Sequence, residues 1–272
     1  MKNNIIVTTD FSEGSANALN YACGLAKDHE LGIVITRIYT IPDGYAGEGL
    51  SLASVDEGIQ ADRDRLTALL ADARNSYPGV DIDGKLVVGN FLGSLSGLSG
   101  ELHPNVIIMG AIGEYSDLLN WDDDWLNALI NISCPVLIIP QHIRYSPIKN
   151  IAFACDYKSV CTPSQIAAIK NLVKITQANF YLVHVTPVID AGEPQHIAAY
   201  REVFGDLNPV FETVENKQVI KGVADFVPAH DIDLLIVIPR KHGLWYSLFN
   251  KSYTRQLAKL NNLPVMALHE DN

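Results

Sequence analysis

The chain has 272 residues, 48% of them hydrophobic and 19% charged, which is enough apolar material for one large domain or two ordinary ones. A net charge of −11 argues against a general binder of nucleic acids or anionic membranes, and no apolar run is long enough to span a bilayer. The segment before Asp10 is too short and too quickly acidic for a signal peptide. We therefore expect a cytoplasmic protein.

The first half reads as strands alternating with helices. Apolar runs predict strands at residues 4–8, 32–39, 82–88, 105–109 and 135–139. Apolar residues at helical spacing predict helices at 12–29, 55–75, 92–103 and 122–132. Runs such as NVIIMG and CPVLIIP are continuous rather than alternating, which is typical of strands buried on both faces of a parallel sheet. Right-handed crossovers then give a doubly wound α/β fold.

The same order returns after QHIRYSPIKN, a polar stretch suited to a linker. The second half is predicted to have strands at 150–154, 179–186, 210–215, 233–238 and 264–268. Its predicted helices lie at 162–177, 195–204, 219–229 and 251–261.

Constant spacing between the halves indicates a duplication. Gly110 and Pro239 are 129 residues apart, and so are Pro135 and Pro264. We predict two tandem doubly wound domains, each a five-stranded parallel sheet flanked by helices. The predicted domains are residues 1–145 and 146–272.

The cysteines are scattered without a C-x-x-C pair, which favours buried thiols in a reducing compartment. A redox or metal role for Cys155 and Cys161, which bracket Asp156, is the alternative. No histidine stands at ligand spacing beside them, so we predict no metal site there.

Three stretches of the first half carry a resemblance to a known family: IIVTTDFSEGSANALNYACGLA at the start, VIIMGAIG and ISCPVLIIP. They resemble the universal stress protein family in its tandem, two-domain form. The second half repeats the plan with IAFACDYKS, FYLVHVTPV and DLLIVIP, so the resemblance covers nearly the whole chain. It implies a sheet whose strand ends hold ATP or another adenine nucleotide in the members that bind one. It also implies pairing of the last strands of two domains, which a tandem chain can satisfy internally.

The resemblance assigns candidate nucleotide-binding residues to both halves. An acid after the first strand of each half would lie beside the base and ribose, and loop glycines would let backbone N–H groups approach the phosphates. The candidates are Asp10, Gly110, Gly113, Asp156, Val185, Lys251 and Ser252. No catalytic residue is predicted.

The first half departs from the family's phosphate loop. Three carboxylates, Asp122–Asp124, stand where the family has Gly-Ser, and like charges would repel a triphosphate. The simplest interpretation is a helix N-cap with acids in the first turn. A Mg²⁺ site and a contact surface for a basic partner are the alternatives.

The second half departs differently, because Pro239 and His242 replace both loop glycines. Ser252 keeps the hydroxyl position, and Lys251 precedes it. Together with Arg240, these side chains predict either an anion site or a solvated basic loop with an N-cap at Ser252.

The two acids each precede a better helix cap. Ser12 follows Asp10, and Thr162 follows Asp156, so neither carboxylate is needed to cap the next helix. This favours a position for both acids that faces the crevice at the carboxyl ends of the strands. Either carboxylate could instead stabilise the local turn by hydrogen bonds to nearby backbone groups, without contacting a ligand.

His184 lies toward the end of the second strand of the second half, where the resemblance gives it a family counterpart, and Arg37 takes the matching place in the first half. A structural histidine is favoured over a catalytic one at position 184.

Three functions compete at this point. The leading one is a non-catalytic stress-response protein with degenerate or altered nucleotide sites. A sensor that binds an adenine nucleotide or another anion in the second half is the first alternative, and a slow Mg-dependent ATPase at Asp122–Asp124 is the second. We expect no nucleic-acid or membrane partner, internal pairing of the two domains, and a homodimer as a further option.

Overall fold

The structure is a computed structural model that describes residues 4–41, 52–111, 132–155, 161–188, 194–239 and 263–269. The strands of the first half are β1 (Asn4–Thr8), β2 (Gly32–Tyr39), β3 (Asp81–Val88), β4 (Val106–Gly110) and β5 (Val136–Ile139). Those of the second half are β6 (Asn150–Cys155), β7 (Asn179–Thr186), β8 (Val210–Glu215), β9 (Leu234–Val237) and β10 (Val265–Ala267).

Helices connect these strands. They are α1 (Glu13–His29), α2 (Leu52–Ser76), α3 (Phe91–Leu102), α5 (Pro163–Thr176), α6 (Pro194–Phe204) and α7 (Val219–Ala229), with a short 3-10 helix η2 (Gly205–Leu207). Apart from η2, the sequence predicted each described element to within three residues. The helices predicted at 122–132 and 251–261 lie outside the described residues.

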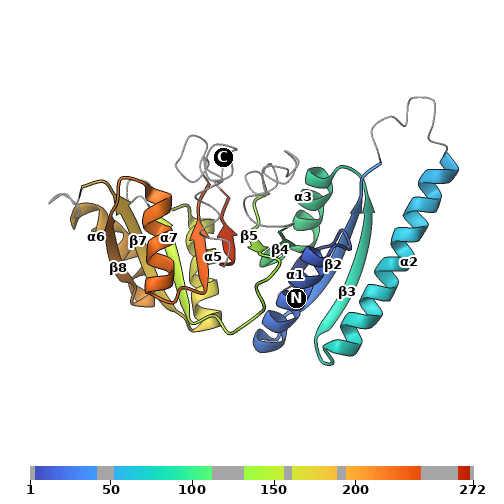
Figure 1. Ribbon diagram of the computed structural model, residues 1–272, viewed down its shortest axis with the longest axis horizontal. Coiled ribbons are helices and arrows are strands. Elements are labelled where there is room, and N and C mark those ends of the chain that lie inside the picture. The colour runs from blue at the N-terminus through green and yellow to red at the C-terminus, as the bar shows by residue number, and fades with distance from the viewer. Residues whose placement is uncertain are drawn as a thin grey trace.

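All ten of these strands lie in one sheet, in the order β3-β2-β1-β4-β5-β10-β9-β6-β7-β8 (Figure 1). Pairing is parallel within each half. Where the halves meet, β5 and β10 pair antiparallel, with Leu137 opposite Met266. The expected internal pairing through the last strands is therefore present. The two predicted sheets are joined into one, while the division at residue 145 stays a prediction.

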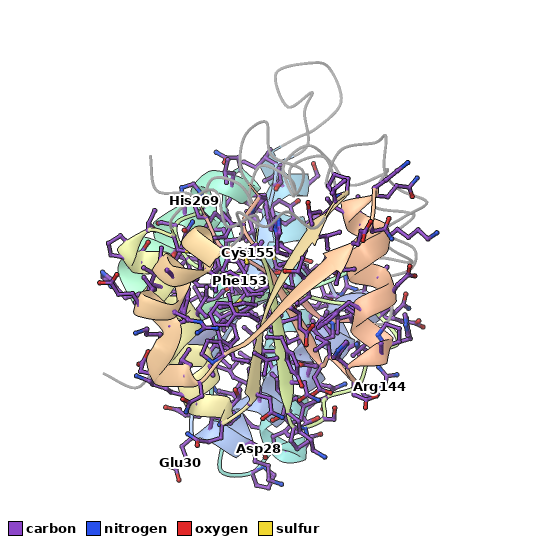
Figure 2. All side chains as sticks on the ribbon, turned by 90° about the vertical axis from the view of Figure 1, so that its left-hand side faces the viewer. Asp28, Glu30, Arg144, Phe153, Cys155 and His269 are labelled. Atoms are coloured by element: carbon purple, nitrogen blue, oxygen red, sulfur yellow. The ribbon has the colours of Figure 1, made fainter. Side chains whose placement is uncertain are left out.

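Two apolar cores cover the two faces of the sheet, and each runs through both halves. Helices α1, α2, α5 and α6 pack on one face, and α3 and α7 pack on the other. Neighbouring strand residues alternate between the cores, as Ile5 and Val7 on one face and Ile6 on the other illustrate. Side chains such as the buried Phe153 fill the layer between helices and sheet (Figure 2). Burial on both faces explains the continuous apolar runs.

The cysteines are unpaired and buried, as predicted: Cys23, Cys134, Cys155 and Cys161. Burial raises the pKa of the Cys23 thiol to about 12, so this group stays a neutral apolar side chain at ordinary pH.

The segment that connects the two halves, residues 140–149, packs against α1 through residues 140–145. Asn17, only 4% exposed, donates two hydrogen bonds from Nδ2, to the carbonyl oxygens of Pro140 at 3.0 Å and Ile143 at 2.8 Å. Arg144 donates to the Asn17 Oδ1 in turn. A single buried amide thus satisfies two backbone carbonyls where the chain leaves β5.

Tyr145, further along the same segment, also contacts α1. The Tyr145 ring lies directly over Gly24, where any side chain would overlap with it. Its ring meets Tyr21 edge to face at 5.2 Å, and its hydroxyl donates to Asp28 at 2.7 Å. Burial and the neighbouring Asp28 raise the pKa of Tyr145, so the hydroxyl remains a donor. The connection between the halves is therefore a fixed part of the fold.

Replacing Asn17 by Ala should lower the free energy of unfolding by about 1–3 kcal/mol, because the carbonyl oxygens of Pro140 and Ile143 each lose a donor. Urea titration followed by circular dichroism measures the loss. Asn20, exposed on the same helix and bonded only to the Tyr77 hydroxyl among described residues, is the matched control. We expect Asn20→Ala to change the free energy by no more than about 0.5 kcal/mol. Equal losses in the two variants would contradict the described role of Asn17.

Candidate functional site

The chain turns sharply at the carboxyl end of β1, where the resemblance placed a ligand. Phe11 has a φ of 64°, in the left-handed region that a bulky residue rarely adopts. Its backbone N–H donates to the Thr9 Oγ1 at 3.0 Å, and this oxygen lies 3.2 Å from the Ser15 hydroxyl. The turn is thus held by side chains on both sides of Phe11.

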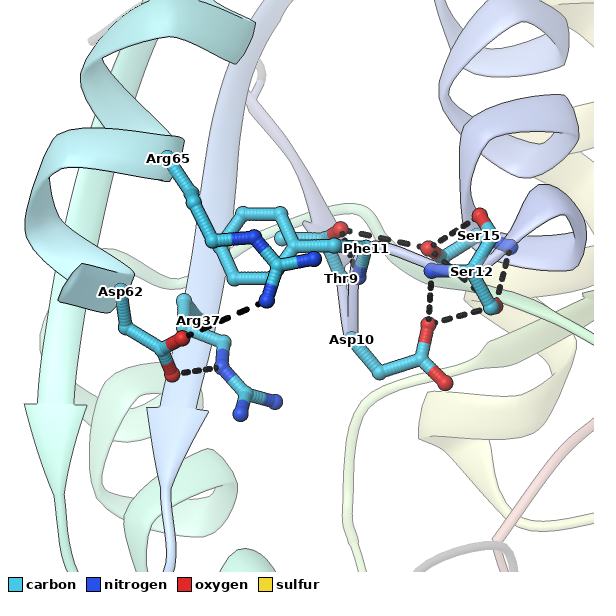
Figure 3. Close-up of polar contacts among 8 residues, drawn as sticks. All are labelled: Thr9, Asp10, Phe11, Ser12, Ser15, Arg37, Asp62 and Arg65. Atoms are coloured by element: carbon cyan, nitrogen blue, oxygen red, sulfur yellow. Dashed lines mark hydrogen bonds and ion pairs between the residues drawn. The ribbon is translucent and has the colours of Figure 1, made fainter. Parts of the chain in front are cut away.

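Asp10 lies in the middle of this turn and is exposed. Its Oδ1 accepts hydrogen bonds from the Ser12 backbone N–H at 2.9 Å and from the Ser12 hydroxyl at 2.6 Å. Partial burial alone would raise the pKa of Asp10, but the hydrogen bonds from Ser12 and Ser15 outweigh it and leave the pKa below its usual value. Ser12 itself is the N-cap of α1, accepting from the Ser15 N–H at 3.2 Å, as predicted. Asp10 therefore supports the cap, and its second oxygen points away from the turn (Figure 3).

A second cluster lies beside this turn, between β2 and α2 (Figure 3). Arg37, on β2, donates from Nε to the Asp62 Oδ2 at 2.6 Å. Arg65 lies 4.0 Å from the other oxygen of Asp62. The guanidinium carbons of Arg37 and Arg65 lie 5.4 Å and 4.4 Å from the centre of the Phe11 ring. The cluster ties the turn after β1 to the long helix α2.

The charges of these two groups balance. Arg37 and Arg65 carry two positive charges, and Asp62 and Asp10 carry two negative ones. The Asp62 side chain is only 9% exposed, so its charge is well placed to neutralise the arginine beside it. The described part of this edge therefore offers no net positive charge to an anion.

Gly110 ends β4 and touches the first turn of α1. A Cβ at Gly110 would overlap with the Gly14 carbonyl oxygen and come within 2.8 Å of the Ser15 nitrogen. A Cβ at Gly14 would in turn lie 2.5 Å from the carbonyl oxygen of Ala111. Close packing of helix on strand thus requires a glycine at position 110 with or without a phosphate. Gly113, the other predicted loop glycine, lies outside the described residues.

The second half is built differently at the matching place. Thr162 caps α5 in a reciprocal capping box with Gln165, as the Thr-Pro sequence predicted. Ser164 stands two residues after this cap, where α1 has Gly14, and Pro239 stands where β4 has Gly110. The glycine pair that brings α1 onto β4 is therefore missing from the second half.

Of the candidates in the second half, Val185 is described. Its side chain is 7% exposed and packs in the core, where a Cβ at Gly222 of α7 would lie 2.6 Å from it. Its buried side chain offers no contact to a ligand. His184 lies next to it, with Nδ1 3.1 Å from the carbonyl oxygen of Cys155, which fits the expected structural role. The other candidates of this half, Asp156, Lys251 and Ser252, and the Asp122–Asp124 run of the first half lie outside the described residues.

The model of the universal stress protein family matches residues 1–140, more than half of the chain. The chain belongs to the universal stress protein family. No curated protein sequence matches it.

Solved structures agree with this universal stress protein in fold. A universal stress protein from Archaeoglobus fulgidus DSM 4304 has a TM-score of 0.75 and 16% identity, with 100% of each chain covered. A protein from Pseudomonas aeruginosa UCBPP-PA14 has a TM-score of 0.56 and 12% identity, covering 98% of this chain and 93% of that chain. At these identities the likeness concerns the fold. Among the residues that the structure describes, we find no helix with the length and hydropathy of a transmembrane segment.

The sequence did not single out Phe11, Asp62 or Arg65 in this universal stress protein. Asp62 carried a usable signal, because it stands at helical spacing from Val55 and Leu66, both buried, and is therefore a carboxylate on the apolar face of α2. Such a residue calls for a cationic partner, and Arg37 at the end of the neighbouring strand supplies it.

Gly110→Ala should destabilise the protein by about 3 kcal/mol, since the added methyl group meets backbone atoms that cannot move independently. Gly97 in α3 is the matched control, because it is exposed and its Cβ would meet open space. Gly97→Ala should stabilise by about 0.5–1 kcal/mol through helix propensity. Thermal and urea unfolding of both variants decide the matter, and a neutral Gly110→Ala would refute the packing explanation.

The lowered pKa of Asp10 makes stability depend on pH. A carboxyl whose pKa is lower in the folded state contributes stability above its unfolded pKa, near 3.9, and loses it as pH falls through the folded value. Asp10→Asn should therefore flatten the decline in unfolding free energy between about pH 5 and pH 2. Asp72→Asn, which removes an exposed carboxylate from α2, controls for the change in net charge. Identical pH profiles in the wild type and Asp10→Asn would contradict the assignment.

Proposed function

We propose that this universal stress protein is non-catalytic. We also propose that its first half binds the nucleoside part of a nucleotide but lacks the groups that would bind a polyphosphate. The balance of charge at the carboxyl edge carries the proposal. Asp62 neutralises Arg37 and lies near Arg65, and Asp10 adds a second carboxylate close by. A polyphosphate is held by excess positive charge and free backbone N–H groups, whereas ribose hydroxyls are held by neutral or acidic acceptors.

The sequence supports the same interpretation beyond the described residues. Three carboxylates, Asp122–Asp124, stand where the family's phosphate loop has Gly-Ser. In the second half, Pro239 and His242 replace both glycines. The protein would then respond to a nucleoside-like ligand without turning over ATP.

Thermal denaturation with a series from nucleoside to triphosphate of one base tests the proposal. A nucleoside at ten times its Kd should add about 1.4 kcal/mol, or about 3–6 °C for a chain of this size. We expect the shift to stay level or fall as phosphates are added, with and without Mg²⁺, and to be lost in Asp10→Asn but kept in Asp72→Asn. A shift that grows steadily from nucleoside to triphosphate would overturn the proposal.

Three variants separate the competing functions. A shift with triphosphate that disappears in Lys251→Glu and survives in Asp10→Asn would assign binding to the second half, in line with an anion sensor. ATP turnover that is abolished by Asp123→Asn would make the protein a Mg-dependent ATPase. We expect neither result, and turnover no faster than that of buffer alone.

A further inference from the structure

Arg37 keeps hydrogen-bond donors at the first-half edge that its ion pair does not use. Its Nε donates to Asp62, and the described residues supply no acceptor for its two terminal nitrogens. The side chain as a whole is 23% exposed, and these nitrogens form its free end. In Figure 3 they point away from Asp62, toward the edge at which β1 and β2 end and Asp10 lies.

The guanidinium is held in this position on two sides. Asp62 fixes its Nε at 2.6 Å, and its Cζ lies over the Phe11 ring, 5.4 Å from the ring centre. Phe11 is itself fixed, because its left-handed backbone is bonded to Thr9 and Arg65 stacks on its ring at 4.4 Å. A guanidinium held at Nε presents its terminal N–H groups as a planar donor pair with little freedom to turn.

A donor pair of this kind selects two adjacent acceptors. Carboxylates, phosphates and the O6/N7 edge of guanine offer such a pair, whereas adenine offers one acceptor at N7 beside a donor at N6. Since Asp10 and Asp62 balance Arg37 and Arg65, an anion gains no net attraction here. A neutral acceptor pair is favoured instead, and Asp10 remains free to accept hydroxyl groups from a ribose.

We infer that the first-half site recognises a 6-oxopurine nucleoside, with Arg37 reading O6 and N7 of the base and Asp62 positioning Arg37. The inference rests on the proposed function, because it assumes that this edge faces a nucleoside. It goes further by naming the base, and it makes adenine the weaker ligand.

Calorimetric titration of the full-length protein with guanosine, inosine and adenosine tests the inference. Guanosine and inosine share O6 and N7, so both should bind about 5- to 150-fold tighter than adenosine. Arg37→Gln should reverse the order, because a glutamine amide pairs with N6 and N7 of adenine. Arg37→Lys keeps the charge without the planar pair and should remove most of the preference.

Asp62→Asn tests the positioning role, since it removes the carboxylate charge that holds Arg37 at Nε and leaves only a weaker neutral acceptor. We expect the preference for guanosine over adenosine to shrink while weak binding of both remains. Arg63→Gln and Asp64→Asn change the same residue types on the exposed side of α2 and should leave the preference unaltered. Urea unfolding confirms that each variant is folded before its affinities are compared.

The outcomes are distinguishable. Equal binding of guanosine and adenosine to the wild type, or an unchanged ratio in Arg37→Gln, would overturn this inference and leave the proposed function standing. Arg37-dependent binding of inorganic phosphate or acetate in place of the nucleosides would also overturn it, as recognition of an anion. Absence of any nucleoside binding would overturn both the inference and the proposed function.

Discussion

The arrangement of the whole molecule depends on the antiparallel pairing of β5 with β10. Each of these strands would otherwise be the edge of a five-stranded parallel sheet, with unpaired backbone groups open to other chains. Their pairing is short, with Leu137 opposite Met266 at its centre. Apolar side chains of both halves cover it, because each of the two cores continues across the junction. Backbone pairing and apolar burial therefore act together to make one sheet from a duplicated sequence.

This junction fixes the strand ends from which the candidate sites are built. The segment after β5 is bonded to Asn17 and stacked over Gly24, so the connection adds no hinge between the halves. Although the two halves share this sheet, their residues at the strand ends differ. In the first, Gly14 and Gly110 bring α1 against β4, and the turn beside them carries Asp10. The second has Ser164 and Pro239 at these places, which accounts for unequal chemistry on equivalent strands.

The fold could be predicted largely from sequence, because its strands are continuous apolar runs and its caps, Ser12 and Thr162, are residues that favour that position. The pairing of the halves came from the family resemblance, and the shared cores came only from the structure. The cluster of Arg37, Asp62 and Phe11 was not predicted, because it depends on the rotation of α2 and on a left-handed residue that no local pattern signals. Gly110 shows the converse, since a glycine expected in a phosphate loop has a packing reason of its own.

Native-state hydrogen exchange in increasing urea tests most directly whether the joined sheet is a single cooperative unit. If pairing of β5 with β10 and the shared cores hold the halves together, the slowest amides of β1, β5, β6 and β10 should open with one free energy and one dependence on urea. Separate free energies for β1 and β6, with the amides of β5 and β10 exchanging at the lower of the two, would show that the halves unfold independently and would contradict this account.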